Sequence, residues 1–181
     1  LVALVVSGGH TFLVEMRDHL TYRLLGQTVD DAAGEAFDKV GRLLGLPYPG
    51  GPAISRAAEA ATDRAVAFPR AWLGDSYDFS FSGLKTAARR VIAAARAVEG
   101  LPPDDPDVRL SEGAVAELSW GFQDSVVDVL VTKTIRAAAA TDARCIVLGG
   151  GVAANAALRA RLAGEAEGRG LSLVIPRPAL C

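Results

Sequence analysis

The pattern of apolar positions predicts strands near both ends of the chain and helices between them. Apolar runs over Leu1–Ser7 and Thr11–Met16 flank a Gly-Gly pair, which is typical of a β-hairpin with its turn at residues 7–11. A third strand is predicted over Tyr22–Val29, and two more over Arg144–Leu148 and Leu171–Ile175. The last two enclose a helical segment, so parallel pairing is expected there.

Helical periodicity occupies the segments between these strands. Asp30 and Asp31 provide capping carboxylates ahead of an Ala-rich helix that runs to about Leu46. Further helices are predicted over Ala53–Ala61, Gly83–Val98, Ser111–Ala140 and Ala153–Glu167. Turns or irregular connections are predicted over Pro47–Pro52, Thr62–Asp78, Leu101–Asp107 and Gly149–Gly151.

This order of elements predicts an α/β fold in three regions. Residues 1–61 carry a hairpin sheet and helix, residues 62–140 a helical insert region, and residues 141–181 a βαβ unit of the nucleotide-binding type. Fold class by itself does not give function.

Composition and charge exclude several classes of protein. Half of the 181 residues are apolar and 22% are charged, as in a globular chain of one or two domains. The 19 Lys and Arg against 21 Asp and Glu disfavour a nucleic-acid binder that works by bulk charge. No apolar run approaches the roughly 20 residues of a membrane helix. Cys145 and Cys181 can build neither a disulfide framework nor a four-thiolate zinc site, so a reducing compartment is expected.

The ends of the chain have no polar lead-in or tail. It begins inside the apolar run Leu1–Val6 and stops at Cys181, soon after a strand. We therefore expect an internal fragment of a longer protein.

Three glycine-containing segments are candidates for ligand contact. Gly8 and Gly9 free backbone amides to approach a phosphate, although a plain hairpin explains them equally well. Pro49–Pro52 is a rigid loop that could receive an anion or serve only as a turn. Gly149–Ala154 satisfies Gly-x-Gly-x-x-Ala by letter, but Arg177 rather than an acid closes the next strand. Asn155 follows this segment and adds a side-chain amide that could reach a base or ribose. We interpret the segment as a turn that contacts an adenosine.

Polar side chains add further candidates. Asp31, Glu35 and Asp38 share one predicted helix stripe beside Lys39 and could bind hydroxyls, an amine or a metal, although a solvated face explains the spacing better. Gly34 within that helix hints at close approach of another group. His10 is interpreted as structural or solvated.

The segment Phe79–Thr86 places small hydroxyls, Gly83 and Lys85 before a helix. It lacks the Gly-x-x-x-x-Gly-Lys-Ser/Thr spacing, so a Walker-type loop is excluded. The Arg-bearing helix that follows could face a nucleic acid or only water. No Ser-His-Asp, Cys-His or His-Glu-x-x-His arrangement supports a protease.

Five segments together resemble the TsaD family of tRNA adenosine threonylcarbamoyltransferases. They are Ser7–Thr11, Asp30–Lys39, Tyr48–Pro52, Phe79–Thr86 and Gly150–Asn155. The resemblance is colinear and spans nearly the whole chain. It implies an actin-like, sugar-kinase-like ATPase fold (ASKHA) that holds nucleotide between two lobes, of which this chain would cover mostly the second.

The resemblance also implies which residues bind substrate. The match to the family's phosphate-side loop covers Val5, Val6, Ser7, Gly8 and Gly9. Asp38 matches a carboxylate directed at the ribose, which reverses the solvated-face interpretation for this residue. Gly51 lies in the ligand-contacting loop, and Asn155 matches the adenosine-side amide. No catalytic residue is assigned, and the roles of His10, Asp31, Glu35 and Lys85 stay open.

The implied reaction transfers a threonylcarbamoyl group from threonylcarbamoyl-AMP to the exocyclic amine of the adenosine 3′ of a tRNA anticodon, in the cytoplasm. One divalent metal, iron or zinc, is expected in the full-length protein. Its ligands, a His-x-x-x-His pair upstream and an Asp beyond Cys181, lie outside this chain, which alone is expected to be inactive. The implied partners are tRNA and small TsaB-like and TsaE-like proteins, with no membrane.

Two other interpretations keep the fold and change the function. The chain could belong to a non-catalytic paralogue that serves as a scaffold in the same modification complex, although intact Asp38 and Asn155 argue against this. It could also belong to a small-molecule kinase or carbamoyltransferase of the same superfold.

Overall fold

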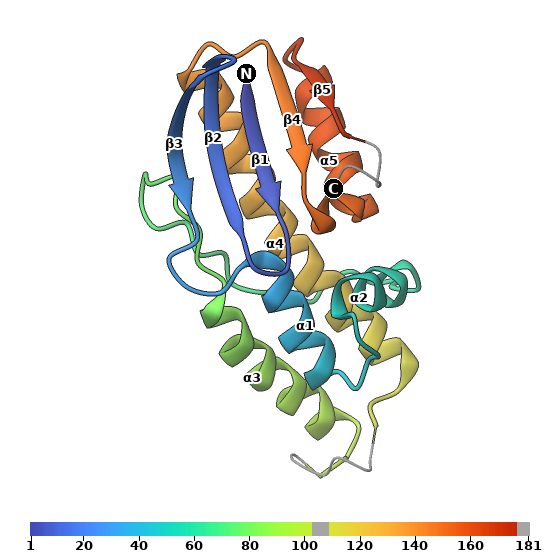
Figure 1. Ribbon diagram of the computed structural model, residues 1–181. Helices are drawn as coiled ribbons and strands as arrows, with labels where there is room; N and C mark the ends of the chain where they lie inside the picture. Colours follow the sequence, from blue (N-terminus) through green and yellow to red (C-terminus); the bar gives the residue numbers. More distant parts are fainter. Residues whose placement is uncertain (103–108, 177–181) are drawn as a thin grey trace.

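A computed structural model describes residues 1–102 and 109–176 and shows a five-stranded sheet in the order β3-β2-β1-β4-β5 (Figure 1). The strands β1 (Val2–Val6), β2 (Thr11–Asp18) and β3 (Thr21–Gln27) form an antiparallel meander. On its other side β1 pairs in parallel with β4 (Cys145–Gly149), and β4 pairs in parallel with β5 (Ser172–Val174). The first and last parts of the chain therefore build one sheet.

Five α-helices accompany the sheet in the described residues. They are α1 (Ala33–Leu43), α2 (Gly50–Glu59), α3 (Ser82–Val98), α4 (Glu112–Ala140) and α5 (Ala156–Glu167), and a short 3-10 turn, η1 (Gly151–Ala154), precedes α5. Figure 1 shows α4 running behind the sheet and continuing past α1 and α2. The helices α1, α2 and α3 gather beyond the carboxyl ends of β1 and β4.

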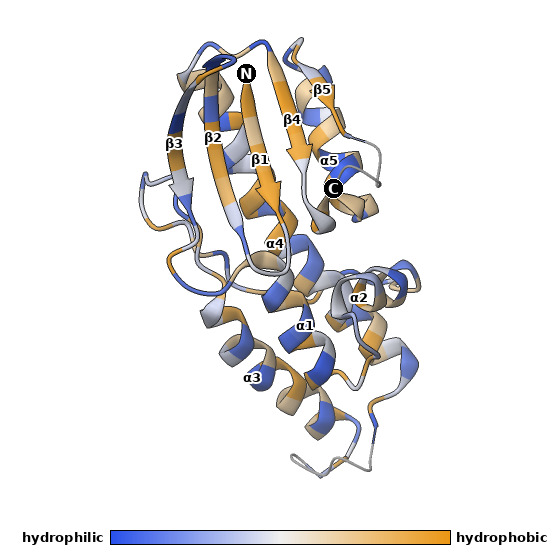
Figure 2. Cartoon of the chain, in the orientation of Figure 1, coloured by the Kyte–Doolittle hydropathy of each residue, from blue (hydrophilic) through white to orange (hydrophobic). Residues whose placement is uncertain are grey.

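The core lies between the central strands and α4. In β1, Val2, Leu4 and Val6 are fully buried, and in β4 so are Ile146 and Leu148. Apolar colouring is strongest on these strands, whereas α1 and α3 carry many hydrophilic positions (Figure 2). Because α4 is buried on most of its circumference, it behaves as a core helix rather than as a surface helix with one apolar stripe.

The structure confirms most predicted elements and shifts two helix starts. The hairpin, the third strand, the long helix and the parallel βαβ ending are all present. The helix α2 begins at Gly50 rather than Ala53, since Pro52 falls in its first turn, where no amide hydrogen is needed. The helix α5 begins at Ala156 rather than Ala153, because η1 occupies the preceding residues.

The predicted capping role of Asp30 and Asp31 on the helix that follows them is wrong. Ala32 precedes α1 without a side-chain cap, and the amide of Ala33 donates instead to Thr11 Oγ1 at 2.9 Å. The Asp30 carboxylate turns to the distant start of α3. There it accepts hydrogen bonds from the amides of Phe81 and Ser82 and from two serine hydroxyls. Asp30 therefore caps α3, which is distant in the sequence, and not the adjacent α1.

The segment 62–78 contains no helix or strand, as predicted, yet it is held firmly against α4. The ammonium of the fully buried Lys133 donates to the carbonyl oxygens of Trp72, Ser76 and Asp78. Burial lowers the pKa of Lys133, and the nearby Arg136 lowers it further. Most of the predicted connection at 101–107 lies outside the described residues, as do Arg177 and Cys181.

Candidate functional site

A cavity of about 510 Å³ opens at the carboxyl ends of β1 and β4, where Gly8 and Gly151 line it. Its walls come from the β1–β2 turn, from α1, from the start of α2 and from the connection between β4 and α5. The residues that line it include Gly8, Gly34, Asp38, Gly51, Gly151 and Asn155. We call this cavity the glycine cleft. In open α/β sheets, the carboxyl ends of the strands are the usual place for a ligand.

Four residues that the sequence analysis expects to contact substrate line this cleft. Gly8, Asp38, Gly51 and Asn155 come from four separate parts of the chain and meet there. The other expected residues do not line the cleft. They are Val5 and Val6 in β1, Ser7, whose carbonyl accepts from the Gly34 amide at 3.2 Å, and the exposed Gly9.

Close main-chain contacts give the cleft its shape. A Cβ on Gly34 would lie 2.6 Å from the carbonyl oxygen of Ser7, so α1 rests directly on the hairpin backbone. This confirms the close approach that a glycine within the helix suggested. Gly150 has φ of +89° and would place a Cβ 2.3 Å from the carbonyl oxygen of Val6. Only glycine fits at either position.

Asp38 links α1 to the start of α2. Its Oδ1 accepts a hydrogen bond from the Gly50 amide at 2.7 Å and thereby satisfies one of the free amides at that helix start. Its other oxygen has no hydrogen-bond partner within residues 1–102 and 109–176. The carboxylate can therefore hold the loop and still accept a hydrogen bond from a hydroxyl or amine in the cleft.

The amide of Asn155 also has a structural role, which the sequence analysis missed. Its Oδ1 caps α5 by accepting from the Leu158 amide at 2.9 Å, and its Nδ2 donates to Gln123 Oε1 at 2.7 Å. An Asn before an Ala-rich helix is a capping signal. Gln123 carries no such signal, because it is a buried residue among apolar positions of α4. One hydrogen of the Asn155 amide remains for a ligand.

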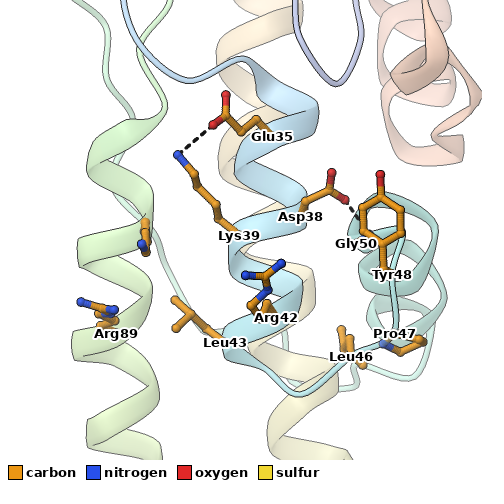
Figure 3. Close-up of a pocket in the computed structure, with 11 residues that line it drawn as sticks. Glu35, Asp38, Lys39, Arg42, Leu43, Leu46, Pro47, Tyr48, Gly50 and Arg89 are labelled. Carbon is orange, nitrogen blue, oxygen red and sulfur yellow. Dashed lines mark hydrogen bonds and ion pairs between the residues drawn. The ribbon is translucent and has the colours of Figure 1, made fainter.

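The predicted stripe of three carboxylates on one helix is wrong for Asp31, whereas Glu35 and Asp38 both lie on α1 and line one cavity. Asp31 lies before α1 rather than within it, and Asp31 and Glu35 both pair with Lys39 Nζ, at 2.6 and 3.0 Å. Hydrogen bonds to Asp31 and then to Glu35 raise the pKa of Lys39. Asp38 instead points to Gly50 of α2, as Figure 3 shows. Two carboxylates thus share one lysine, while the third lines the glycine cleft.

A second cavity, of about 540 Å³, lies between α1, α3 and the loop before α2 (Figure 3). Its charged lining residues are Glu35, Asp38, Lys39, Arg42, Lys85 and Arg89, and we call it the basic cavity. Lys85, whose role the sequence analysis left open, lies here. Arg42 and Arg89 were missed, although the four-residue spacing of Lys85 and Arg89 places both on one side of a helix.

Two smaller predictions can be placed as well. His10 is exposed in the hairpin turn, where its amide donates to Ser7 Oγ at 3.0 Å, which agrees with a structural or solvated residue. The hydroxyls of Ser80 and Ser82 are occupied by Asp30, and Phe79 and Phe81 are buried and stacked. The segment Phe79–Thr86 therefore anchors α3, and of its polar side chains Lys85 reaches a cavity.

No metal site and no membrane helix is found in the described part of the chain. Among residues 1–102 and 109–176, no group of three or more His, Cys, Asp or Glu residues could hold a metal ion. Over the same residues, no helix has the length and apolar character needed to cross a bilayer.

A family model described as TsaD, tRNA N6-adenosine threonylcarbamoyltransferase, matches residues 2–181. The chain belongs to the TsaD family. A relative of that name from Bacillus subtilis (strain 168) is 51% identical over 99% of this chain and 49% of its own length. Another, from Thermomicrobium roseum, is 53% identical over 100% of this chain and 51% of its own length. The chain spans about half the length of the curated relatives it matches.

Two solved structures share the fold at low identity. The crystal structure of T. kodakarensis HypF has a TM-score of 0.56 and 13% identity, over 87% of this chain and 18% of that chain. The activator of 2-hydroxyisocaproyl-CoA dehydratase from Clostridium difficile, with bound ADPNP, has a TM-score of 0.51 and 15% identity, over 97% of this chain and 53% of that chain. The expected α/β fold is confirmed, and these two proteins share it.

Proposed function

We propose that this chain forms the adenylate-binding half of a tRNA N6-adenosine threonylcarbamoyltransferase. The observation that carries the proposal is the meeting of Gly8, Asp38, Gly51 and Asn155 in one cleft. Two further findings support it. Relatives with that name match nearly the whole chain at about 50% identity, and a protein of the same fold holds ADPNP.

The cleft offers a separate group for each part of threonylcarbamoyl-AMP. Backbone amides of the Gly8 turn and the start of α2 would face the phosphate, where the helix dipole favours negative charge. The free oxygen of Asp38 would accept from a ribose hydroxyl, and the remaining Asn155 hydrogen would donate to the nucleoside. Arg56, an exposed residue of α2 that also lines the cleft, adds a cation near the negative groups.

The reaction needs orientation more than a reactive side chain. The exocyclic amine of the tRNA adenosine attacks the carbonyl carbon of the mixed anhydride, and a C–N bond forms. The C–O bond to the phosphate breaks, AMP leaves with the electron pair, and the amine releases one proton. Positioned amides that hold the anhydride and stabilise the leaving phosphate lower this barrier. The chain's own residues are proposed to do this.

Other parts of the proposal come from the family resemblance alone. The acceptor would be tRNA, the partner proteins TsaB-like and TsaE-like, and the place of reaction the cytoplasm. A divalent metal, iron or zinc, would be held by residues outside this chain. None of the steps assigned to the glycine cleft uses that metal.

Calorimetric binding of a stable threonylcarbamoyl-adenylate analogue to the full-length protein tests the proposal. We expect Asp38→Ala and Asn155→Asp each to weaken binding by about tenfold to a hundredfold, since each removes a hydrogen bond in a partly charged site. The Asp at 155 keeps an oxygen that can cap α5, so the fold should survive. Asp31→Asn is the matched control, because Asp31 pairs with Lys39 outside the cleft. Undiminished binding in both cleft variants, with unchanged circular dichroism, would contradict the residue assignments.

A further inference from the structure

The basic cavity shares a wall with the glycine cleft. Asp38 and Tyr48 line both cavities, and the hydrogen bond from the Gly50 amide to Asp38 holds that wall in place. Figure 3 shows Tyr48 on the α2 side of the basic cavity, across from Arg89 on α3. A molecule bound in one cavity would therefore lie beside a molecule bound in the other.

Charge in the basic cavity is unbalanced. Lys39, Arg42, Lys85 and Arg89 line it together with Glu35 and Asp38, and once Asp31, which pairs with Lys39 Nζ, is counted the formal surplus is one positive charge, although the whole chain carries −2. Lys39 is already neutralised by Asp31 and Glu35. Within residues 1–102 and 109–176, Arg42, Lys85 and Arg89 form no ion pair. Three cations that have no ion pair among the described residues thus line one cavity.

Two helices present these cations to the same space. Lys85 and Arg89 lie one turn apart on α3, and Arg42 stands on the neighbouring α1. Cations held close together repel one another, and a ligand with several negative groups removes that repulsion. Guanidinium groups bind phosphates in particular, because their planar N–H donors match phosphate oxygens.

We propose that the basic cavity binds the phosphate backbone of the acceptor RNA, while Tyr48 provides a stacking surface for a base at the rim shared with the glycine cleft. This inference rests on the proposed function. Tyr48 is 83% exposed, so its ring is free to stack. Single-stranded RNA loops are bound by this combination of aromatic stacking and phosphate contacts. An acidic protein segment would use the cations but has no need of the exposed ring, and therefore RNA is favoured.

Binding of an unmodified anticodon stem-loop RNA to the full-length protein, followed by fluorescence anisotropy over a salt series, tests the proposal. The triple variant Arg42→Gln/Lys85→Gln/Arg89→Gln should bind at least about tenfold more weakly. The slope of log affinity against log salt should fall by about 2 to 3, since each lost phosphate contact removes about 0.7 to 1. Tyr48→Ala should weaken binding about tenfold with little change in slope.

Arg90→Gln is the matched control, because Arg90 is exposed on α3 and does not line the basic cavity. If the triple variant kept the affinity and slope of this control, the inference would be overturned. It would also be overturned if a polyglutamate peptide of equal charge competed as well as the RNA.

Calorimetry with the adenylate analogue separates this inference from the proposed function. The triple variant should bind the analogue like the wild type, since Gly8, Gly51 and Asn155 are untouched. If the wild type failed to bind the analogue while the RNA slope still fell in the triple variant, the proposed function would be wrong and the phosphate site would stand.

Discussion

The glycine cleft and the basic cavity lie side by side, yet they are built by opposite means. Glycine main chain forms much of the cleft wall, at Gly8, Gly34, Gly51 and Gly151, and Gly34 packs directly against the Ser7–Gly8 backbone. Long side chains from two helices wall the basic cavity. A main-chain wall cannot move without shifting an entire element, whereas a surface side chain can be shortened without loss of packing. Shape and stability should therefore be coupled in the cleft and separable in the basic cavity.

The strongest test of this contrast is Gly34→Ala. The added Cβ would lie 2.6 Å from Ser7 O and 2.8 Å from Gly8 Cα, and both are backbone atoms that cannot rotate away. We expect a loss of about 3 kcal/mol in the free energy of unfolding, measured by urea denaturation, together with loss of adenylate binding.

Gly113→Ala provides the control for that experiment. Gly113 lies in the first turn of α4 with nothing within 4 Å of a built Cβ, so the same substitution should be neutral or stabilise by up to about 1 kcal/mol. Equal changes in unfolding free energy at the two positions would show that stability does not depend on the close packing of α1 against the hairpin.

Asp38 sharpens the comparison because it belongs to both cavities. Asp38→Ala removes the acceptor for the Gly50 amide and should cost about 1 to 2 kcal/mol of unfolding free energy. Asp38→Asn keeps an oxygen for that amide, so stability should largely return while the charge is lost. Thermal unfolding of both variants measures the difference. Equal destabilisation by Ala and Asn would contradict a capping role for Oδ1.

Asp30 lies in the connection between β3 and α1, and its carboxylate holds the start of α3. The same helix carries Lys85 and Arg89. Partial burial alone would raise the pKa of Asp30, but hydrogen bonds from Ser80, Phe81 and Ser82 outweigh it and hold this pKa below its ordinary value of 3.8. A lowered folded pKa gives stability that is present above the unfolded value and lost as pH falls through the folded one.

We therefore expect Asp30→Asn to lower the unfolding free energy by about 1 kcal/mol near neutral pH. The wild type and the variant should converge as the solution is acidified below about pH 4. Urea denaturation at a series of pH values measures this convergence. A difference that stayed constant down to strong acid would show that the Asp30 charge is not what holds α3.

The smallest effect is expected in the wall of the basic cavity. Arg42→Gln and Arg89→Gln remove exposed charges that have no ion pair in the described part of the chain. The unfolding free energy should change by less than about 0.5 kcal/mol in either variant. A loss of 2 kcal/mol or more in the unfolding free energy, about the size expected at the cleft, would mean that these side chains support the fold. The two cavities would then not differ in how their walls contribute to stability.

Local sequence patterns determined most of the elements of this protein. Strands, the long helix and the βαβ ending follow from apolar periodicity, because burial of one face or of a whole element repeats at a fixed spacing. The glycines at 8, 34 and 51 also stand out in the sequence, because unusual backbone freedom is visible without a structure, whereas the carboxylate at 38 was singled out only by the family resemblance.

Only the tertiary structure decided which of these residues lie together. The parallel pairing of β1 with β4 brings the Gly8 turn next to Asn155, although 147 positions separate them in the chain. Contacts between separate elements also redirected Asp30 to α3, joined Asn155 to Gln123 and tied Asp38 to the start of α2. Local pattern cannot settle such choices, because a polar side chain finds its partner among groups that the whole fold brings within reach.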